Sequence, residues 1–124
     1  MPLPPGVTTP GYVNGLDEIY DGHGVMLTPS FLRGGIKTKV LEAFSFGAPV
    51  IGNNQTFESM PIGDYPLRIN EEAELVAILR DPEGHRALLQ AAADQGRAYV
   101  RDHHAPAVFA NRWRRLMGLA TPAE

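Results

Sequence analysis

The sequence predicts an α/β fold: a partial Rossmann-like parallel sheet with flanking helices. Two short apolar segments, 25–28 and 49–51, enclose a segment with helical periodicity over 37–46. Strands that are apolar throughout are typical of a parallel sheet covered on both faces, and a helix crossing between them forms a right-handed βαβ unit. Most of the 13 glycines precede residue 53, whereas the second half is rich in Ala, Leu and Arg. We therefore expect strands and tight loops first, and helices after them.

The first 28 residues predict irregular chain and three short elements. Residues 1–10 are rich in proline, and the apolar segment 11–13 is expected to be a short strand. Segment 16–20 follows Asn14, a favourable helix N-cap, and predicts a short helix. Turn-forming residues bound the apolar run 25–28, which predicts a buried strand.

The central helix and the strand after it have clear boundaries. We expect a loop over 29–36 and then a helix over 37–46. Gly47 ends this helix, since glycine readily adopts the left-handed conformation that follows many helices. The next strand is 49–51, and irregular chain then leads to a last short strand at 67–69.

The helix over 37–46 has two distinct faces at about 100° per residue. Its apolar side chains, which we expect to pack on the sheet, are Val40, Leu41 and Phe44. Its opposite, polar side carries Thr38, Glu42 and Ser45. Phe46 lies near the polar stripe, which suggests that this face borders a cleft or another domain.

Three helices are expected in the second half, over 71–80, 82 to about 103, and 106–117. Pro82 suits the first position of the second helix, and Gly118 ends the third. Apolar residues at helical spacing predict the buried faces of these helices: Ala73, Val76 and Leu79; Leu88, Leu89, Ala92, Tyr99 and Val100; Val108, Phe109, Trp113, Leu116 and Met117. Trp113 is thus expected in the core, and Arg112, Arg114 and Arg115 are expected on a solvated face.

Composition narrows the class of protein. The net charge of −3 argues against a nucleic-acid-binding protein, which usually has a strongly basic face. Without cysteine, neither a disulfide nor a thiolate metal site is possible. No apolar run approaches the ~20 residues of a membrane span, and residues 1–6 lack the features of a secretory signal. We expect a cytoplasmic protein, and peripheral contact of the arginines with anionic lipid stays open.

Histidines are weaker candidates for chemistry. His103 and His104 are adjacent, so on a helix they point about 100° apart and are poorly placed to share a metal. We expect them to have a structural role, and we expect His23 to be a turn residue.

The loop over 29–36 combines glycines with the expected binding edge of the sheet. Ligands of parallel α/β sheets bind outside the carboxyl ends of the strands, where this loop lies. Gly34 and Gly35 allow close approach of the backbone and point N–H groups toward an anion.

Cations cluster where the helix begins, although the helix dipole disfavours them there. Lys37 and Lys39 are point charges suited to phosphate, and Arg33 could add a third cation. Two interpretations stay open at this point: an anion-binding site, or a solvated surface on which Lys39 pairs with Glu42.

Residues 11–53, GYVNGLDEIYDGHGVMLTPSFLRGGIKTKVLEAFSFGAPVIGN, resemble the C-terminal, donor-binding domain of GT-B glycosyltransferases of group 1. The shared pattern has a short Gly-Tyr-Val strand, an acidic helix ending in tyrosine, and a strand ending in proline. A glycine-rich loop, Lys-x-Lys, Glu-Ala and Gly-x-Pro-Val follow. In this chain the pattern falls on 11–13, 16–20, 25–29, Gly34 and Gly35, Lys37 and Lys39, Glu42 and Ala43, and 47–50.

The resemblance implies a glycosyltransferase that uses a nucleotide-diphosphate sugar as donor and needs no metal or other cofactor. Glu42 matches the glutamate that binds the ribose hydroxyls, because one carboxylate can accept from two neighbouring O–H groups. Lys37 and Lys39 are the expected catalytic residues, which neutralise charge as the diphosphate leaves.

Further donor-binding residues are implied around them, namely Arg33, Gly34, Gly35, Thr38 and Thr56. Gly34 also stands where many relatives have a second glutamate that contacts the transferred sugar. Thr56 belongs to a polar segment, 53–58, which follows the strand at 49–51. An ordinary polar turn is the alternative there.

The expected organisation is an irregular N-terminal segment (1–10), a partial donor-binding domain (11–118) and a tail (119–124). The resemblance implies a role in polysaccharide biosynthesis. GT-B enzymes have two Rossmann-like domains with the active site between them. We therefore expect this chain alone to be inactive and to need an N-terminal acceptor domain or partner chain. A homodimer is a further expectation. Two alternatives are a stand-alone or degenerate nucleotide- or phosphate-binding module without catalysis, and an unrelated α/β interaction domain.

Overall fold

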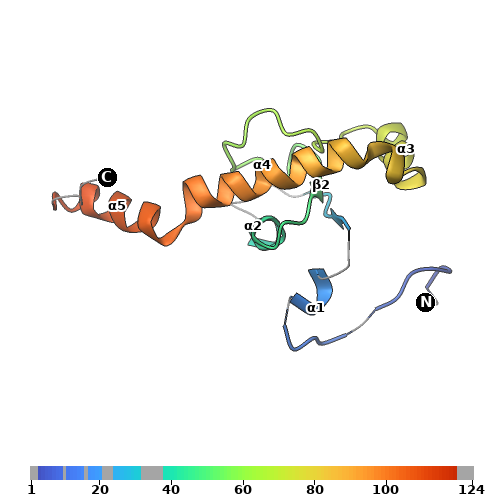
Figure 1. Cartoon of the computed structure of the whole chain (residues 1–124), viewed down its shortest axis with the longest axis horizontal. Coiled ribbons are helices and arrows are strands. Elements are labelled where there is room, and N and C mark those ends of the chain that lie inside the picture. The colour runs from blue at the N-terminus through green and yellow to red at the C-terminus, as the bar shows by residue number, and fades with distance from the viewer. Residues whose placement is uncertain (1–2, 10, 16, 21–23, 32–37, 120–124) are drawn as a thin grey trace.

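The computed structural model describes residues 3–9, 11–15, 17–20, 24–31 and 38–119. Figure 1 shows the order of the elements along the chain. They are α1 (Asp17–Tyr20), β1 (Met26–Leu27), α2 (Thr38–Ser45), β2 (Val50–Ile51), α3 (Glu72–Arg80), the 3₁₀ turn η1 (Glu83–His85), α4 (Arg86–His104) and α5 (Pro106–Leu116). The expected α/β class is confirmed, as is the strand–helix–strand order at its centre.

The sheet is parallel, as the βαβ pattern predicts. Met26 lies opposite Val50, and Leu27 lies opposite Ile51. Gly52 continues the pairing with a single parallel bridge to Arg68, so the strand expected at 67–69 is reduced to one bridge.

Two expectations about the front of the sheet are wrong. Residues 11–13 form a bend and not a strand, and Tyr12 is 91% exposed. β1 covers only the middle of 25–28 and is not fully buried, since Leu27 is 47% exposed. Successive side chains of a strand point to opposite faces, and the described residues cover mainly the face that carries Met26.

α2 packs as its two faces predict. Val40 and Phe44 are fully buried, Leu41 is partly buried, and Thr38 and Glu42 are exposed.

Gly47 ends α2 with a positive φ of 79°. Its N–H donates to the carbonyl of Phe44 at 3.0 Å, and the N–H of Ala48 donates to that of Ala43 at 2.9 Å. This pair of bonds is a Schellman motif, which satisfies the last carbonyls of the helix.

Phe46 has a local aromatic partner, and its expected contact with a cleft or another domain stays a prediction. Its ring stacks on that of Tyr20, with centroids 4.9 Å apart and planes inclined by 15°. α1 therefore covers part of the polar side of α2.

The irregular segment between β2 and α3 is part of the core. Phe57, Met60, Ile62, Tyr65 and Leu67 are all buried, although no regular element holds them. The hydroxyl of Tyr65 donates to the carbonyl of Val50 at 2.8 Å and accepts from its N–H at 3.0 Å. One side chain thus satisfies both backbone groups of a β2 residue.

α3 forms where expected, but it buries a different face. Ile78 is buried and Leu75 packs against the core, whereas Ala73 is exposed and Leu79 is 51% exposed. The expected buried face is therefore wrong for Ala73 and Leu79, whereas Val76 is half-buried.

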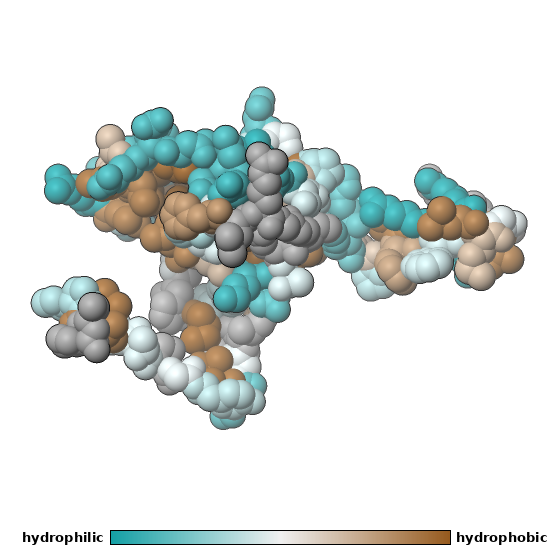
Figure 2. All heavy atoms as spheres, turned by 180° about the vertical axis from the view of Figure 1, so that it is seen from behind, coloured by the Kyte–Doolittle hydropathy of each residue, from teal (hydrophilic) through white to brown (hydrophobic). Residues whose placement is uncertain are grey.

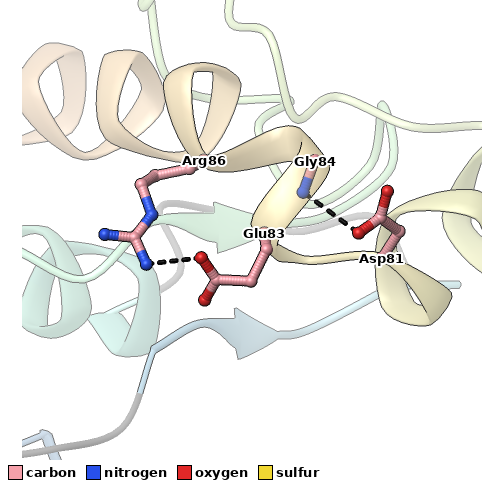
Figure 3. A network of polar contacts seen from close by, with 4 residues as sticks. All are labelled: Asp81, Glu83, Gly84 and Arg86. Atoms are coloured by element: carbon pink, nitrogen blue, oxygen red, sulfur yellow. Dashed lines mark hydrogen bonds and ion pairs between the residues drawn. The ribbon is translucent and has the colours of Figure 1, made fainter.

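The turn η1 joins α3 to α4 through local polar contacts (Figure 3). The carboxylate of Asp81 accepts from the N–H of Gly84 at 3.1 Å, and Arg86 forms an exposed ion pair with Glu83. The helix expected from Pro82 thus begins as a 3₁₀ turn and becomes α-helical at Arg86.

α4 is the longest helix, and its buried face includes the predicted Ala92 and Tyr99. Gly96 also lies on this face, where the Phe44 ring of α2 packs against it. Figure 1 shows α4 running past α2 and the sheet.

α5 does not enter the core. Phe109 is 63% exposed and Trp113 is 50% exposed, so the expectation that they are buried is wrong. The two rings contact each other instead, with centroids 6.1 Å apart. Figure 1 shows the reason, because α5 continues from the end of α4 away from the rest of the domain.

Candidate functional site

A small cavity of about 150 Å³ lies at the carboxyl ends of β1 and β2. Its walls come from the segments that follow the two strands and from the start of α3, and they include Pro29, Phe31, Asn53, Asn70 and Leu75. This is the edge at which parallel α/β sheets bind their ligands. The expected position of the binding edge is therefore matched by a cavity.

Asn53 ties together the two segments that leave the strands. Its side-chain oxygen accepts from the N–H of Ser30 at 3.1 Å, and its amide nitrogen donates to the carbonyl of Ser30 at 2.8 Å. The same oxygen accepts from the N–H of Thr56 at 3.2 Å. One amide group thus fixes the relative position of two loops at the mouth of the cavity.

Thr56 supports this arrangement from below the surface. It is 2% exposed, and its hydroxyl donates to the carbonyl of Thr28 at 2.8 Å and accepts from the N–H of Asn53 at 3.1 Å. Gly52 makes the fit possible, because a Cβ at that position would overlap the Thr56 side chain. The hydroxyl is fully used within the protein, which makes Thr56 a positioning residue in this structure.

Asn54 and Asn70 form a second link beside the cavity. The N–H of Asn54 donates to the Asn70 side-chain oxygen at 3.0 Å, and the Asn70 amide donates to the Asn54 side-chain oxygen at 3.1 Å. Glu71 and Glu72 follow directly and also line the cavity. The rim therefore carries amide and carboxylate groups from two separate parts of the chain.

These asparagines are functional candidates that pattern reasoning undervalued. The available signal was the polar segment 53–58 directly after a strand that ends at the binding edge. Nothing in the sequence pairs Asn53 with Ser30 or Asn54 with Asn70, because these partners are 23 and 16 residues apart.

Three of the predicted site residues lie on α2 and are solvent-exposed, namely Thr38, Lys39 and Glu42. In the described part of the chain no ion pair joins Lys39 to Glu42, so the pairing alternative is not observed. Burial and, secondarily, the charge of Glu42 raise the pKa of Tyr20, which places this carboxylate near α1. The predicted site residues Arg33, Gly34, Gly35 and Lys37 lie outside the described residues, as does His23.

His103 and His104 have the structural surroundings that their positions suggest. Both rings pack on the ring of Tyr99, with centroids 4.7 and 5.2 Å away. Burial lowers the pKa of His104, and the neighbouring His103 and Arg112 add to this effect. Within the described ranges, no group of three or more His, Cys, Asp or Glu could hold a metal ion.

Among the described helices, none is both long and apolar enough to cross a membrane.

Comparison with known proteins identifies the family. The family model described as "Glycosyl transferases group 1" matches residues 2–83. No curated protein and no solved structure matches the chain. The matched range contains the whole βαβ unit, the Asn53 links and every residue that lines the cavity at the carboxyl edge. The chain therefore belongs to the group 1 glycosyltransferase family.

Proposed function

We propose that this chain is the donor-binding part of a group 1 glycosyltransferase and recognises a nucleotide-diphosphate sugar for transfer to an acceptor. The observation that carries the proposal is the coincidence of the family match with the cavity at the carboxyl ends of β1 and β2. Sheet edges of this kind are where parallel α/β proteins bind nucleotides.

The exposed face of α2 supplies chemistry suited to such a donor. The carboxylate of Glu42 can accept hydrogen bonds from both hydroxyls of a ribose. Lys39, one turn nearer the start of α2, carries a cation suited to a diphosphate, and we assign Lys37 the same role. Stabilising the departing diphosphate in this way needs no metal ion.

The links made by Asn53 support the proposal by preorganising the edge. A ligand that binds between two loops loses affinity if it must first order them. Here the loops after β1 and β2 are already joined by hydrogen bonds between the Asn53 side-chain amide and the backbone of Ser30.

A titration with nucleotides tests donor recognition. UDP and GDP, and the matching nucleosides, are titrated into the chain by calorimetry. Glu42→Gln removes the charge and keeps the shape, so we expect roughly tenfold weaker binding of both the nucleotide and its nucleoside. Lys39→Gln should weaken binding of the nucleotide and leave the nucleoside unchanged.

Glu74→Gln is the matched control, because Glu74 is also an exposed helical glutamate but lies on α3 and has no assigned role in donor binding. If Glu42→Gln binds the nucleotide as tightly as wild type does, the assignment of Glu42 to the ribose is contradicted. No heat with either nucleotide at millimolar concentration would contradict donor binding as a whole.

We further propose that sugar transfer needs a second domain or a partner chain that faces this edge. The residues assigned above hold the donor, and none of them is assigned to the acceptor. A radiolabelled donor incubated with this chain alone should therefore give no turnover. Sustained transfer by the chain alone would refute this part of the proposal.

A further inference from the structure

A single residue joins α4 to α5. α4 ends at His104 and α5 begins at Pro106, so Ala105 caps both helices, with φ −66° and ψ 149°. An extended residue between two helices can act as a hinge, because rotation about its backbone bonds redirects the whole second helix. Figure 2 shows the arm that α5 forms beyond this joint, clear of the main body.

Few contacts hold α5 in its position. Val108 and Asn111 are its half-buried residues, and the other residues of the helix are exposed. Its principal neighbour is α4, and it contributes no residue to the buried core. Segments with few buried contacts open at a small fraction of the free energy of global unfolding. The position of α5 is therefore sensitive to modest changes at the joint.

Three aromatic rings cluster where α4 ends. Tyr99 is 6% exposed and belongs to the core, and the rings of His103 and His104 pack on its ring. The Nε2 atom of His104 lies 3.3 Å from the Tyr99 hydroxyl. A neutral imidazole with its proton on Nδ1 accepts a hydrogen bond at Nε2, whereas the doubly protonated ring has no acceptor nitrogen. The protonation state of His104 therefore decides whether it can accept this bond.

The charges that act on His104 are cationic. Burial lowers its pKa, and His103 on α4 and Arg112 on α5 lower it further. Asp102, the nearest acidic residue in the sequence, is exposed and forms an ion pair with Arg101. The dipole at the end of α4 favours a cation and the dipole at the start of α5 disfavours one, so these two effects oppose each other.

The other elements that pack on α4 contact it away from this end. α2 packs at Gly96, about two turns before His104, and η1 precedes the first turn of the helix. The charged and titratable side chains of these two elements are Lys39 and Glu42 on α2, and Glu83 and His85 on η1. None of them contributes to the lowered pKa of His104.

We propose that the joint between α4 and α5 is a pH-sensitive hinge, in which protonation of His104 beside His103 and Arg112 releases α5 from its position on α4. The open joint binds the proton more readily than the closed joint, because Arg112 moves away from His104 when α5 swings out. By linkage, the closed joint has its full stability above about pH 6.5 and loses stability as the pH falls below that value. This hinge is separate from the nucleotide site proposed above.

Distance measurements between two spin labels test the hinge in the whole chain. The sequence contains no cysteine, so Ala91→Cys and Ala110→Cys create the two labelling sites, one at an exposed position of each helix. Double electron–electron resonance then gives the distribution of distances between the two nitroxides. We expect a narrow distribution at about pH 7.5 and a broader or shifted one at about pH 5. The far-UV circular dichroism spectrum should stay that of the folded chain at both pH values.

Substitutions at the joint give the expected magnitude. A like charge about 6 Å away in a water-like medium changes an equilibrium roughly threefold, so Arg112→Gln should lower the open population at about pH 5 roughly threefold. His104→Gln should abolish most of the change with pH, and His104→Lys should open the joint at both pH values. His85→Gln is the matched control, because His85 is also half-buried but lies at the opposite end of α4, and it should leave the response unchanged.

Three results would overturn the proposal. The first is the same distance distribution at both pH values, and the second is a change with pH that persists in His104→Gln. The third is a broadening that coincides with loss of the circular dichroism signal, which would assign the titration to unfolding of the whole chain.

Discussion

Gly96 is the position where packing and helix propensity make opposite predictions. It lies inside α4, where replacing glycine with alanine normally stabilises a helix by about 1 kcal/mol. In this structure, however, a Cβ at Gly96 would overlap the ring of Phe44 on α2. We predict that Gly96→Ala destabilises the protein despite the gain in helix propensity.

The magnitude follows from the burial of the ring. Phe44 is 0% exposed and sits among other core residues, so it cannot turn into solvent to make room for a methyl group. Adding a methyl group to a well-packed core costs about 1–3 kcal/mol, since neighbours must shift or leave their preferred rotamers. After subtracting the propensity gain, we expect a net loss of up to about 2 kcal/mol in the free energy of unfolding.

Urea denaturation followed by far-UV circular dichroism is the suitable measurement. Trp113 is a poor reporter of this change, because it lies half-exposed on α5 outside the core. Ala91→Gly measures the propensity term in the same helix, since Ala91 is exposed on α4, and it should cost about 1 kcal/mol.

A double-mutant cycle separates the clash from other effects. In a Phe44→Leu background fewer ring atoms oppose the new methyl group and the side chain can shift, so the cost of Gly96→Ala should be smaller there. If Gly96→Ala instead raises stability in the wild-type background by the amount that Ala91→Gly lowers it, the close packing of α2 on α4 is refuted. The outcome also bears on function, because this contact holds the helix that carries Glu42.

Three further substitutions test the hydrogen bonds and titrations of the structure. Thr56→Val keeps the shape of the side chain but removes the hydroxyl that pairs with buried backbone groups. It should lower the free energy of unfolding, measured by urea denaturation, by about 1–3 kcal/mol. Thr38→Val, at an exposed threonine, should leave the free energy of unfolding unchanged. Tyr65→Phe should cost about as much as Thr56→Val. Burial also raises the pKa of Tyr65, so wild type should lose stability as pH rises above about 10. Tyr65→Phe should lose less stability over this range. Tyr12→Phe is the control at an exposed tyrosine and should lose as much stability as wild type does. The pKa of His104 is lowered on folding, so the unfolded chain binds the proton more readily, and stability should decline as pH falls below about 6.5. Denaturation of His104→Gln across this pH range should show a shallower decline, and an equal slope would contradict the lowered pKa.

Local signals located most elements of the fold. Gly47 and Gly118 end α2 and α5 with positive φ angles, and Pro106 begins α5, as the sequence predicts. Such signals act within a few residues, because they depend on φ preferences and on the unpaired groups at helix ends. The same is true of the motif on which the family resemblance rests, since its Lys-x-Lys and Glu-Ala pairs lie within seven residues of sequence.

Which surfaces are buried could not be predicted in the same way. Helical spacing is compatible with several neighbouring faces of a short helix, so α3 buries Ile78 and not the face of Ala73 and Leu79. The strand expected at 11–13 lacks a partner among the described residues, and a strand without paired backbone groups does not form.

The candidate site shows the same division. Sequence alone determined the family and the order of the βαβ unit, and it predicted ligand binding at the sheet edge where the cavity lies. Tertiary structure decided that Asn53 joins the two loops, that Thr56 supports them from within, and that Trp113 stays at the surface. The physical reason is that capping and backbone preferences depend on adjacent residues, whereas burial and long-range hydrogen bonds depend on which distant segments the folded chain brings together.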